Sequence, residues 1–354
     1  MARRGDEDAA LLQEVAGERA RLLARLLPSP PGMLDAEFRI VRATGREAPH
    51  VLELLAEHMP GTDVRRRHEW LYERNPHGRS VTVVGYDPRG VPAGITSVFP
   101  RRVLVGGNIR LGAIGGDGFV RPAYRRRGLA SALHRVCREA MAKEGVEFMY
   151  GPPEPHNLKA LLRAGSRLVG EVRRYARMPG LHRALVSLSR LAFRRLRLEP
   201  LSGLDARVAA VWERVAAFAR VSPVRDPTQY AWRFGATPSG RQRGYALVEG
   251  GRPLALCALE RRGDAVAIVD LFAPPERYVE AARAVADAAD ARHVYVQLSA
   301  NGRGASALWR AGFVPRDRKA FQVLAATDDP DAAALFGADS WYYTWADGDV
   351  DEVL

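Results

Sequence analysis

An internal repeat is the feature that most constrains how this chain can fold. The segment 70–78 (Trp-Leu-Tyr-Glu-Arg-Asn-Pro-His-Gly) recurs at 232–240 (Trp-Arg-Phe-Gly-Ala-Thr-Pro-Ser-Gly) with the same Trp, Pro and Gly positions. Further matches follow in the same order at slowly shrinking intervals: Asp117–Phe119 with Asp270–Phe272, and Leu162–Gly165 with Trp309–Gly312. Ordered self-similarity predicts two copies of one domain, and the shrinking intervals indicate that the second copy has lost residues.

The length of the chain agrees with two domains. It has 354 residues, of which 47% are hydrophobic, and that is more than one ordinary domain needs. We expect four segments: an N-terminal helix and linker over 1–35, a first domain over 36–180, a connecting amphipathic helix over 181–199, and a degenerate second domain with a C-terminal tail over 200–354. Within the first domain, the patterns predict a strand, two helices, three strands, a helix, a strand, a helix and a strand.

Two helical segments lie outside the predicted domains. Residues 6–27 place leucines at helical spacing before a proline-rich break, which is typical of a docking or dimer-forming helix. A helix lying on a membrane is the alternative, and the acidic residues among its arginines disfavour it. The basic stretch 181–198 is interpreted as a helix between the domains, and the alternative is a peripheral contact with anionic lipid.

The formal charge of +12 comes nearly all from arginine and would suit a phosphorylated ligand, nucleic acid or an anionic membrane. The sequence has no zinc-finger spacing and no aromatic-basic interleaving, so no nucleic-acid partner is expected. It contains no apolar run of about 18 residues and no recognisable secretion signal. Cys137 and Cys257 fit neither a disulfide nor a metal framework, so we expect a cytoplasmic protein without a metal site.

The segment 119–130 carries the pattern from which chemistry can be inferred. A strand is expected to end near Val120, a loop with three arginines follows, and a helix begins after Gly128. A helix N-terminus offers unpaired N–H groups, a glycine allows close approach, and adjacent arginines add charge-assisted contacts. Together these features predict a pyrophosphate-binding loop.

The loop Arg125–Ala130 (Arg-Arg-Arg-Gly-Leu-Ala) resembles the Q/R-x-x-G-x-G/A loop of the GNAT (GCN5-related N-acetyltransferase) superfamily, and the expected element order resembles that fold. The resemblance covers about 37–178 and, in weaker form, 200–325. It implies an α+β fold of two GNAT-like domains, each a mixed, mostly antiparallel central sheet flanked by helices. The second copy is degenerate because neither a glycine nor an arginine cluster follows Pro275.

The resemblance implies acetyl-CoA as cosubstrate. Its expected contacts are Phe119, Val120, Arg125, Arg126, Arg127, Gly128, Leu129 and Ala130. Asn157 begins the next predicted helix, and we interpret it either as a further contact on the cofactor side or as a helix N-cap.

The implied reaction is direct attack of an amine on the acetyl thioester, which requires a base for the amine proton. The candidate bases are Asp117, Glu154 and His156. Asp270 occupies the position of Asp117 in the copy without the loop, which favours a structural role for both. The family often has a general-acid tyrosine near 161–162, where this chain has leucines. Either another group, such as Tyr175 or water, protonates the leaving thiolate, or the thiolate leaves unprotonated.

Trp70, Tyr72 and Asn75 precede the first central strand, where such folds often build the acceptor wall, although the aromatic residues could also be core. The repeat signature, the loop and the tail resemble tandem GNAT proteins that accompany polysaccharide biosynthesis. That resemblance implies a small-molecule amine acceptor, such as a nucleotide- or lipid-linked amino sugar. The alternatives are an aminoacyl or peptidyl transferase of tandem architecture, and a non-catalytic CoA-binding scaffold. The alternating acids of the tail 341–351 could form a metal site, but we expect an ordered strand with solvated acids.

Overall fold

The computed structural model describes residues 37–177, 196–299, 303–327, 330–337, 340–350 and 353. The predicted helix over 6–27, and the predicted connecting helix as far as residue 195, lie outside this part of the chain. At 196–198 the helix prediction is wrong. These residues begin strand β7 (Leu196–Pro200), which pairs with β9 (Gln242–Glu249). Leu196 and Leu198 alternate along that strand and pack onto the core of the second half, which suits a period of two.

The first half has the predicted order of elements. Its elements are β1 (Arg39–Arg42), α2 (Ala48–His58), α3 (Val64–Arg67), a π-helical turn η1 (His68–Glu73), β2 (Val81–Tyr86), β3 (Pro92–Val105), β4 (Asn108–Val120), a 3₁₀ turn η2 (Pro122–Tyr124), α4 (Leu129–Lys143), β5 (Phe148–Gly151), α5 (Pro155–Arg163) and β6 (Arg167–Arg177). The α+β prediction is therefore confirmed.

The second half repeats this order with one added short strand, β8. After β7 come α7 (Ala206–Val215), η3 (Ala216–Phe218), β8 (Val221–Pro223), α8 (Pro227–Gly235), β9, β10 (Arg252–Arg262), β11 (Ala265–Phe272), η4 (Pro275–Arg277), α9 (Tyr278–Ala288), β12 (His293–Ser299), α10 (Arg303–Arg310), β13 (Phe313–Ala325), η5 (Pro330–Phe336) and η6 (Trp345–Asp347). The repeat seen in the sequence is thus a repeat of structure.

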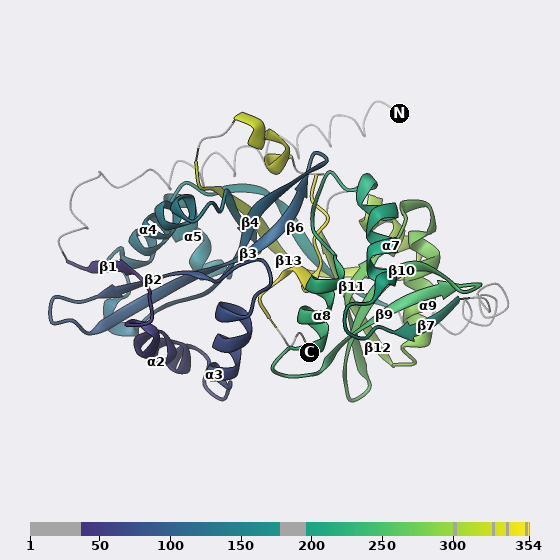
Figure 1. The fold of residues 1–354 in the computed structure, drawn as a ribbon, viewed down its shortest axis with the longest axis horizontal. Coiled ribbons are helices and arrows are strands. Elements are labelled where there is room, and N and C mark those ends of the chain that lie inside the picture. The colour runs from purple at the N-terminus through teal and green to yellow at the C-terminus, as the bar shows by residue number, and fades with distance from the viewer. Residues whose placement is uncertain are drawn as a thin grey trace, which may run out of the picture.

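One sheet runs through both halves in the order β1-β2-β3-β4-β5-β13-β6-β12-β11-β10-β9-β7, with β8 paired to β3. Among the described strand pairs, β4–β5 and β11–β12 are parallel and the others antiparallel. The halves exchange their last strands: β13 pairs with β5 of the first half, and β6 pairs with β12 of the second. The two exchanged strands also pair with each other at the centre of the sheet (Figure 1).

Alternation along the buried strand β2 explains how helices cover both faces of the first half. Val81 and Val83 belong to a core that includes Leu133 of α4, whereas Val84 belongs to a core that includes Leu54 of α2. Because successive side chains point to opposite faces, α4 and α2 lie on opposite sides of the sheet (Figure 1). None of the helices in the described ranges is long and apolar enough to cross a membrane.

The two signature tryptophans of the repeat meet where the halves join. The rings of Trp70 and Trp232 stack with centroids 4.8 Å apart. Each indole Nε1 donates a hydrogen bond to the backbone oxygen of the other residue, over 3.4 Å from Trp70 and 3.2 Å from Trp232. This reciprocal contact places a local two-fold relation between the repeats at the tryptophan pair.

Candidate functional site

The candidate site lies where β4 and β5 separate. The two strands pair only through Gly112–Ile114 and Phe148–Tyr150. Beyond Ile114, β4 continues to Val120 with β3 as its partner. The strand β5 ends at Gly151, and Pro152 and Pro153 follow, which have no N–H to donate to a ladder. The edge of β4 that would face β5 is therefore free of a strand partner over 115–120.

Two adjoining cavities open at this split. The first, which we call the β5 cavity, measures about 710 Å³ and lies beside the end of β5. The second, the loop cavity, measures about 820 Å³ and lies beside the turn from β4 into α4. Both are lined by the same central residues: His58, Pro60, Thr96, Gly118, His134, His156 and Asn157. The two cavities therefore form one hollow with two arms.

The loop cavity brings together nearly all of the residues expected to contact the cofactor. Its lining includes Phe119, Val120, Arg125, Arg126, Gly128, Leu129, Ala130 and Asn157. Arg127 is the exception, because it forms an ion pair with Glu37 and its guanidinium lies 5.2 Å from the ring centroid of Phe38. Arg127 thus fastens the loop to the start of the first half.

The backbone of the loop turns sharply into α4. Arg126 has φ 62° and Gly128 has φ 83°, both in the left-handed region that glycine adopts without strain. A non-glycine residue such as Arg126 is uncommon there and often marks a functional turn. No side chain caps the N-terminus of α4, so the first N–H groups of this helix remain available beside the cavity.

Basic side chains dominate the loop cavity. Arg125, Arg126, Lys159 and Arg163 line it, with Glu57 as the carboxylate among its lining residues. Glu57 is itself held by Arg121 at 2.9 Å. Lys159 and Arg163 are absent from the sequence-based prediction, although their spacing of four on α5 would place them on one helix face. The positive lining complements a ligand with several phosphates.

The β5 cavity has the opposite balance of charge. The carboxylates in its lining are Asp63, Asp117, Glu154 and Asp349, and the arginines are Arg66 and Arg67. The predicted candidates Glu154 and His156 both lie here. Glu154 is exposed and pairs with Lys319 of β13 at 2.7 Å, which lowers its value as a base.

Asp117 is a buried member of an ion pair. It occupies an irregularity of β4 opposite residues 95–97 and has φ 51°. Arg67 donates to it from Nε over 3.1 Å and from NH2 over 2.7 Å. The Tyr72 hydroxyl donates a third hydrogen bond over 2.8 Å, and burial raises the pKa of that hydroxyl. These three hydrogen bonds hold the carboxylate within the buried network, so the structural interpretation of Asp117 fits best.

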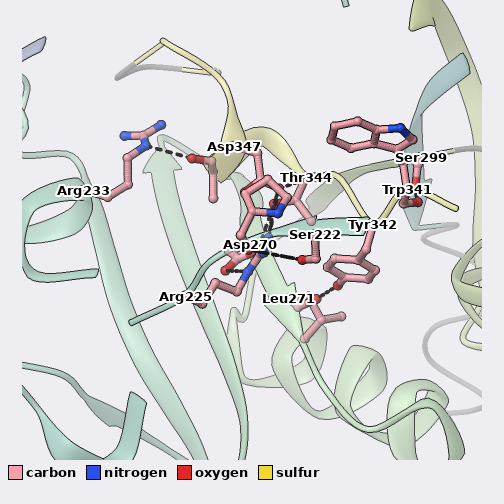
Figure 2. Close-up of polar contacts among 12 residues, drawn as sticks. Ser222, Arg225, Arg233, Asp270, Leu271, Ser299, Trp341, Tyr342, Thr344 and Asp347 are labelled. Carbon is pink, nitrogen blue, oxygen red and sulfur yellow. Dashed lines mark hydrogen bonds and ion pairs between the residues drawn. The ribbon is translucent and has the colours of Figure 1, made fainter. Parts of the chain in front are cut away.

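The second half contains the same arrangement without a loop beside it. Arg225 donates to Asp270 from Nε over 3.0 Å, and the Tyr230 hydroxyl donates over 2.7 Å. In Figure 2, Asp270 and Arg225 lie together beside Thr344 and Asp347 of the C-terminal tail. The recurrence supports a structural role for both Asp117 and Asp270.

The acids of the tail are not solvated as expected. Asp347 is buried and pairs with Arg225 at 2.9 Å, and Asp349 pairs with Arg67 at 3.2 Å. Burial raises the pKa of both carboxyls, and the paired arginines oppose that shift. The prediction of an ordered strand is wrong where 345–347 form the turn η6. The prediction of solvated acids is wrong for Asp347 and Asp349, because each meets an arginine that is distant in the sequence, and Asp351 lies outside the described residues.

Two histidines at the junction of the cavities were missed by the sequence reasoning. His58 ends α2 and stacks on Phe119 with ring centroids 5.2 Å apart. Burial lowers its pKa, and the charge of Asp117 opposes this only in part, so the ring is neutral near pH 7. His134 of α4 contacts Asn157 between Nε2 and Oδ1 at 3.0 Å, and burial lowers its pKa also.

Asn157 is not a helix N-cap. The helix α5 has Glu154 as its N-cap, and Asn157 lies within the first turn. Its side chain reaches His134 and also lies close to β4, because the amide nitrogen is 3.5 Å from where a Cβ on Gly118 would stand. The cofactor-side alternative for Asn157 is therefore the one that agrees with its position.

Besides Arg127, four predicted site residues line neither cavity. Trp70 and Tyr72 are buried core residues, and Asn75 donates to the Pro100 oxygen over 2.9 Å. The π-helical turn η1 faces both aromatic side chains inward, which agrees with the core alternative. Tyr175 packs in the hydrophobic core of the second half, so the structure does not bring it to the thioester site.

These features define an α+β protein with a split parallel strand pair and an arginine-rich loop at the start of a helix. Residues 39–158 match the family model "Acetyltransferase (GNAT) domain". The first half of the chain therefore carries a GNAT domain.

Solved structures share the fold over most of the chain. A GCN5-related N-acetyltransferase from Anabaena variabilis matches with a TM-score of 0.62 and 15% identity, covering 82% of this chain and 73% of that one. One from Kribbella flavida matches with a TM-score of 0.62 and 17% identity, covering 84% and 74%. A probable N-acyltransferase from Enterococcus faecalis matches with a TM-score of 0.62 and 12% identity, covering 82% and 73%. At such identities the likeness shows the fold alone. No curated protein matches the chain by sequence.

Proposed function

We propose that this protein transfers an acetyl group from acetyl-CoA to the amine of a small molecule. The observation that carries the proposal is the split between β4 and β5, which opens directly onto the basic loop cavity. Acetyl-CoA needs a phosphate-binding site at one end and a strand edge that can form hydrogen bonds with the amides of its pantetheine arm. Both are adjacent here, and both lie next to a second cavity with room for an acceptor.

The loop cavity supports the proposed cofactor position. The N-terminus of α4, with Arg125 and Arg126, would hold the pyrophosphate. Lys159 and Arg163 would hold a further phosphate of the same ligand. The free edge of β4 over 115–120 would donate and accept hydrogen bonds along the pantetheine arm.

The proposed reaction takes place at the junction of the two cavities. The ammonium first gives one proton to a neutral histidine, and the neutral amine nitrogen then attacks the carbonyl carbon. The carbon–sulfur bond breaks, and the nitrogen loses its second proton to solvent. His58 is the first candidate because burial keeps its ring neutral, and His156 is the alternative. A backbone N–H near Phe119 or Val120 would polarise the carbonyl, and the thiolate would take a proton from water.

The carboxylates of the β5 cavity support a cationic amine as acceptor. An amino sugar, linked to a nucleotide or a lipid, is the acceptor that we propose first. A GCN5-related glucosamine N-acetyltransferase region of a fungal enzyme matches this chain with a TM-score of 0.55 and 13% identity, covering 81% of this chain and 38% of that one. That likeness concerns the fold, so glucosamine is chosen only as the first probe.

Calorimetric titration with acetyl-CoA tests the cofactor site. Wild type should bind, and Gly128→Glu should not, because the added carboxylate would lie beside the pyrophosphate. Gly128→Ala is the matched control, since it imposes the same left-handed backbone strain without the charge and should retain most of the binding. Failure of the wild type to bind acetyl-CoA would refute the proposal.

Thiol release with glucosamine and other amines then tests catalysis. His58→Gln should lower kcat while leaving the dissociation constant of acetyl-CoA unchanged, and His156→Gln provides the comparison for the second candidate. Binding of acetyl-CoA without acetylation of any amine would instead identify a CoA-binding scaffold.

A further inference from the structure

We infer that the C-terminal tail supplies Asp349 to the β5 cavity as the residue that binds the acceptor ammonium, so that the degenerate second half completes the acceptor site. This inference rests on the proposed function, because it assigns a residue to its acceptor. Asp349 lies well outside the GNAT domain match and reaches the site only through the fold.

The tail is anchored on both halves before it reaches the cavity. Trp341 and Tyr343 belong to the hydrophobic core that contains Tyr150 of β5, and backbone bridges tie the tail to the second half. Trp341 bridges to Val221, and Thr344 bridges to Leu298 at the end of β12. Thr344 and Asp347 then form a capping box around the turn η6, and Asp347 binds Arg225 (Figure 2). Two residues later the chain is at the β5 cavity.

Asp349 is held at the cavity by two contacts to one arginine. Arg67 donates from NH1 to the Asp349 carbonyl oxygen over 3.0 Å and from NH2 to its Oδ2 over 3.2 Å. The carboxylate lies against the face of β4 at Gly116, where an added Cβ would come within 2.2 Å of Oδ2. The absence of a side chain on Gly116 is therefore what gives the carboxylate its place.

The charges at this point do not balance within the network. Arg67 carries one positive charge and contacts two carboxylates, Asp117 and Asp349. Asp117 is buried and already accepts three hydrogen bonds, two from Arg67 and one from Tyr72. The side chain of Asp349 is 22% exposed and lines the cavity. The buried Arg101 adds a further positive charge near Asp349, but the carboxylate itself faces the space from which an amine would approach, and an ammonium group complements it.

The corresponding network in the second half, which we call the twin network, consists of Arg225, Asp270 and Asp347. It shows that an arginine bound to two carboxylates does not by itself leave one of them exposed. Arg225 also contacts two carboxylates, but the side chains of Asp270 and Asp347 are 0% and 6% exposed. Asp347 therefore serves as a buried structural contact. Asp349, which takes the corresponding place beside Arg67, opens onto a cavity. The tail places one acid in each network, and only Asp349 is placed to meet a ligand.

Other residues of the second half lie in the same wall. Pro238 and Ser239, from the second copy of the repeat signature, and Val350 of the tail also line the β5 cavity. The acceptor cavity is thus composite, while the basic residues of the loop cavity all belong to the first half. The geometry assigns cofactor binding to one half and part of acceptor recognition to the other.

The experiment compares Asp349→Asn with Asp347→Asn, its matched control in the twin network. The probe is the amine that is acetylated fastest in a panel of glucosamine, spermidine and a tripeptide with a free N-terminus. Asp349→Asn should raise the acceptor KM about 10-fold to 100-fold, as expected for the loss of a charge-assisted contact in a partly desolvated site. Its acetyl-CoA affinity, measured by calorimetry, should change less than about twofold. Asp349→Glu keeps the charge and should recover part of the acceptor affinity, and Asp347→Asn should lower the Tm but leave the acceptor KM near the wild-type value.

An acceptor KM that is unchanged in Asp349→Asn, or raised equally in both variants, would overturn the inference. If Asp349→Asn failed to fold, the wild type would decide: the alcohol analogue of the accepted amine, such as glucose for glucosamine, should bind at least about 10-fold more weakly. Equal binding of the alcohol and the amine would also overturn it. Failure of the wild type to bind acetyl-CoA would instead refute the proposed function, and that is a separate measurement.

Discussion

Replacing the two stacked tryptophans, singly and together, would measure how strongly the two repeats stabilise each other. Trp70 and Trp232 are both buried and share one stacking contact. Removing a buried tryptophan side chain costs about 3 to 5 kcal/mol. The guanidinium of Arg101 lies 4.8 Å from the Trp232 ring and that of Arg233 lies 5.6 Å from the Trp70 ring. Both arginines are fully buried. Because Arg101 lies closer to its ring than Arg233 does, we expect Trp232→Ala to be the more destabilising single change.

The double variant should be less destabilised than the sum of the single ones, because their shared contact can be lost only once. A stacked aromatic pair contributes about 0.5 to 1.5 kcal/mol beyond its buried area. With the packing that each ring makes on the other, we expect a coupling free energy of about 1 to 2 kcal/mol. An unfolding entropy of about 2.1 cal/mol/K per residue gives roughly 0.7 kcal/mol/K for 354 residues. A loss of about 4 kcal/mol therefore corresponds to a Tm lower by about 6 °C.

The assay is denaturant unfolding followed by far-UV circular dichroism, because the variants remove fluorophores from a chain with six tryptophans. Trp212 provides the control, since it stacks on Phe272 within the second half with ring centroids 5.5 Å apart. The cycle of Trp70→Ala with Trp212→Ala should be additive within about 0.5 kcal/mol. Additivity of the Trp70 and Trp232 changes to the same tolerance would refute the reasoning that this pair couples the repeats.

Three further predictions follow from the geometry. His77 accepts a hydrogen bond from the Arg102 backbone N–H, and burial lowers its pKa to about 4. As the pH falls, the imidazole is protonated in the unfolded chain at a higher pH than in the folded protein, so stability falls below about pH 6.5. Between pH 8 and pH 5, the free energy of unfolding should therefore fall about 2 kcal/mol more in wild type than in His77→Gln. Replacing Lys159 and Arg163 together by Gln should weaken acetyl-CoA binding about 10-fold or more and reduce its salt dependence in calorimetry, whereas equal affinities would exclude these residues from the cofactor site. Arg225→Met leaves two buried carboxylates unpaired and should cost about 3 to 5 kcal/mol in chemical denaturation; a loss below about 1 kcal/mol would contradict a structural role.

The order of elements and the phosphate loop could be predicted because both are local. A short run of β-branched and apolar residues before a turn predicts β2. A strand followed by arginines and Gly128 predicts the turn into α4 without reference to distant residues. The positions of Arg125, Arg126 and Asn157 beside one cavity then follow from that local order. Arg127 has the same local signal and still turns away, because its partner Glu37 belongs to a distant segment.

The exchange of β6 and β13 could not be predicted from the sequence. Each follows a short helix in its own repeat, and each ends the same order of elements. Either strand could pair with the free edge of β5. Antiparallel pairing depends on backbone hydrogen bonds and on the alternation of side chains, and both strands provide these. The choice depends on how the two halves join, and that information is spread over contacts such as the tryptophan pair.

The partners of the tail acids Asp347 and Asp349 at the candidate site could not be predicted from the sequence either. Asp349 finds its arginine 282 positions away, and Asp347 finds its arginine 122 positions away. Alternating acids near a chain end are typically solvated, and no local pattern distinguishes these two. The repeat did contain one usable signal: Asp117 and Asp270 recur although only one copy has the loop, which predicts that both serve the fold.

The exchanged strand also explains why a copy without a phosphate loop can still be required by the site. The split that forms the two cavities needs β5 to stay in the sheet after it leaves β4. The pairing that holds it there is with β13, through Phe148–Gly151 and Gln322–Ala325. The second half therefore fixes the far edge of β5, and Lys319 of the same strand also contacts Glu154 at the end of β5. A first half alone would contain the loop, Gly128 and its arginines but would lack β13, so its own β6 would have to pair with β5 to hold the opposite wall of the cavity in place.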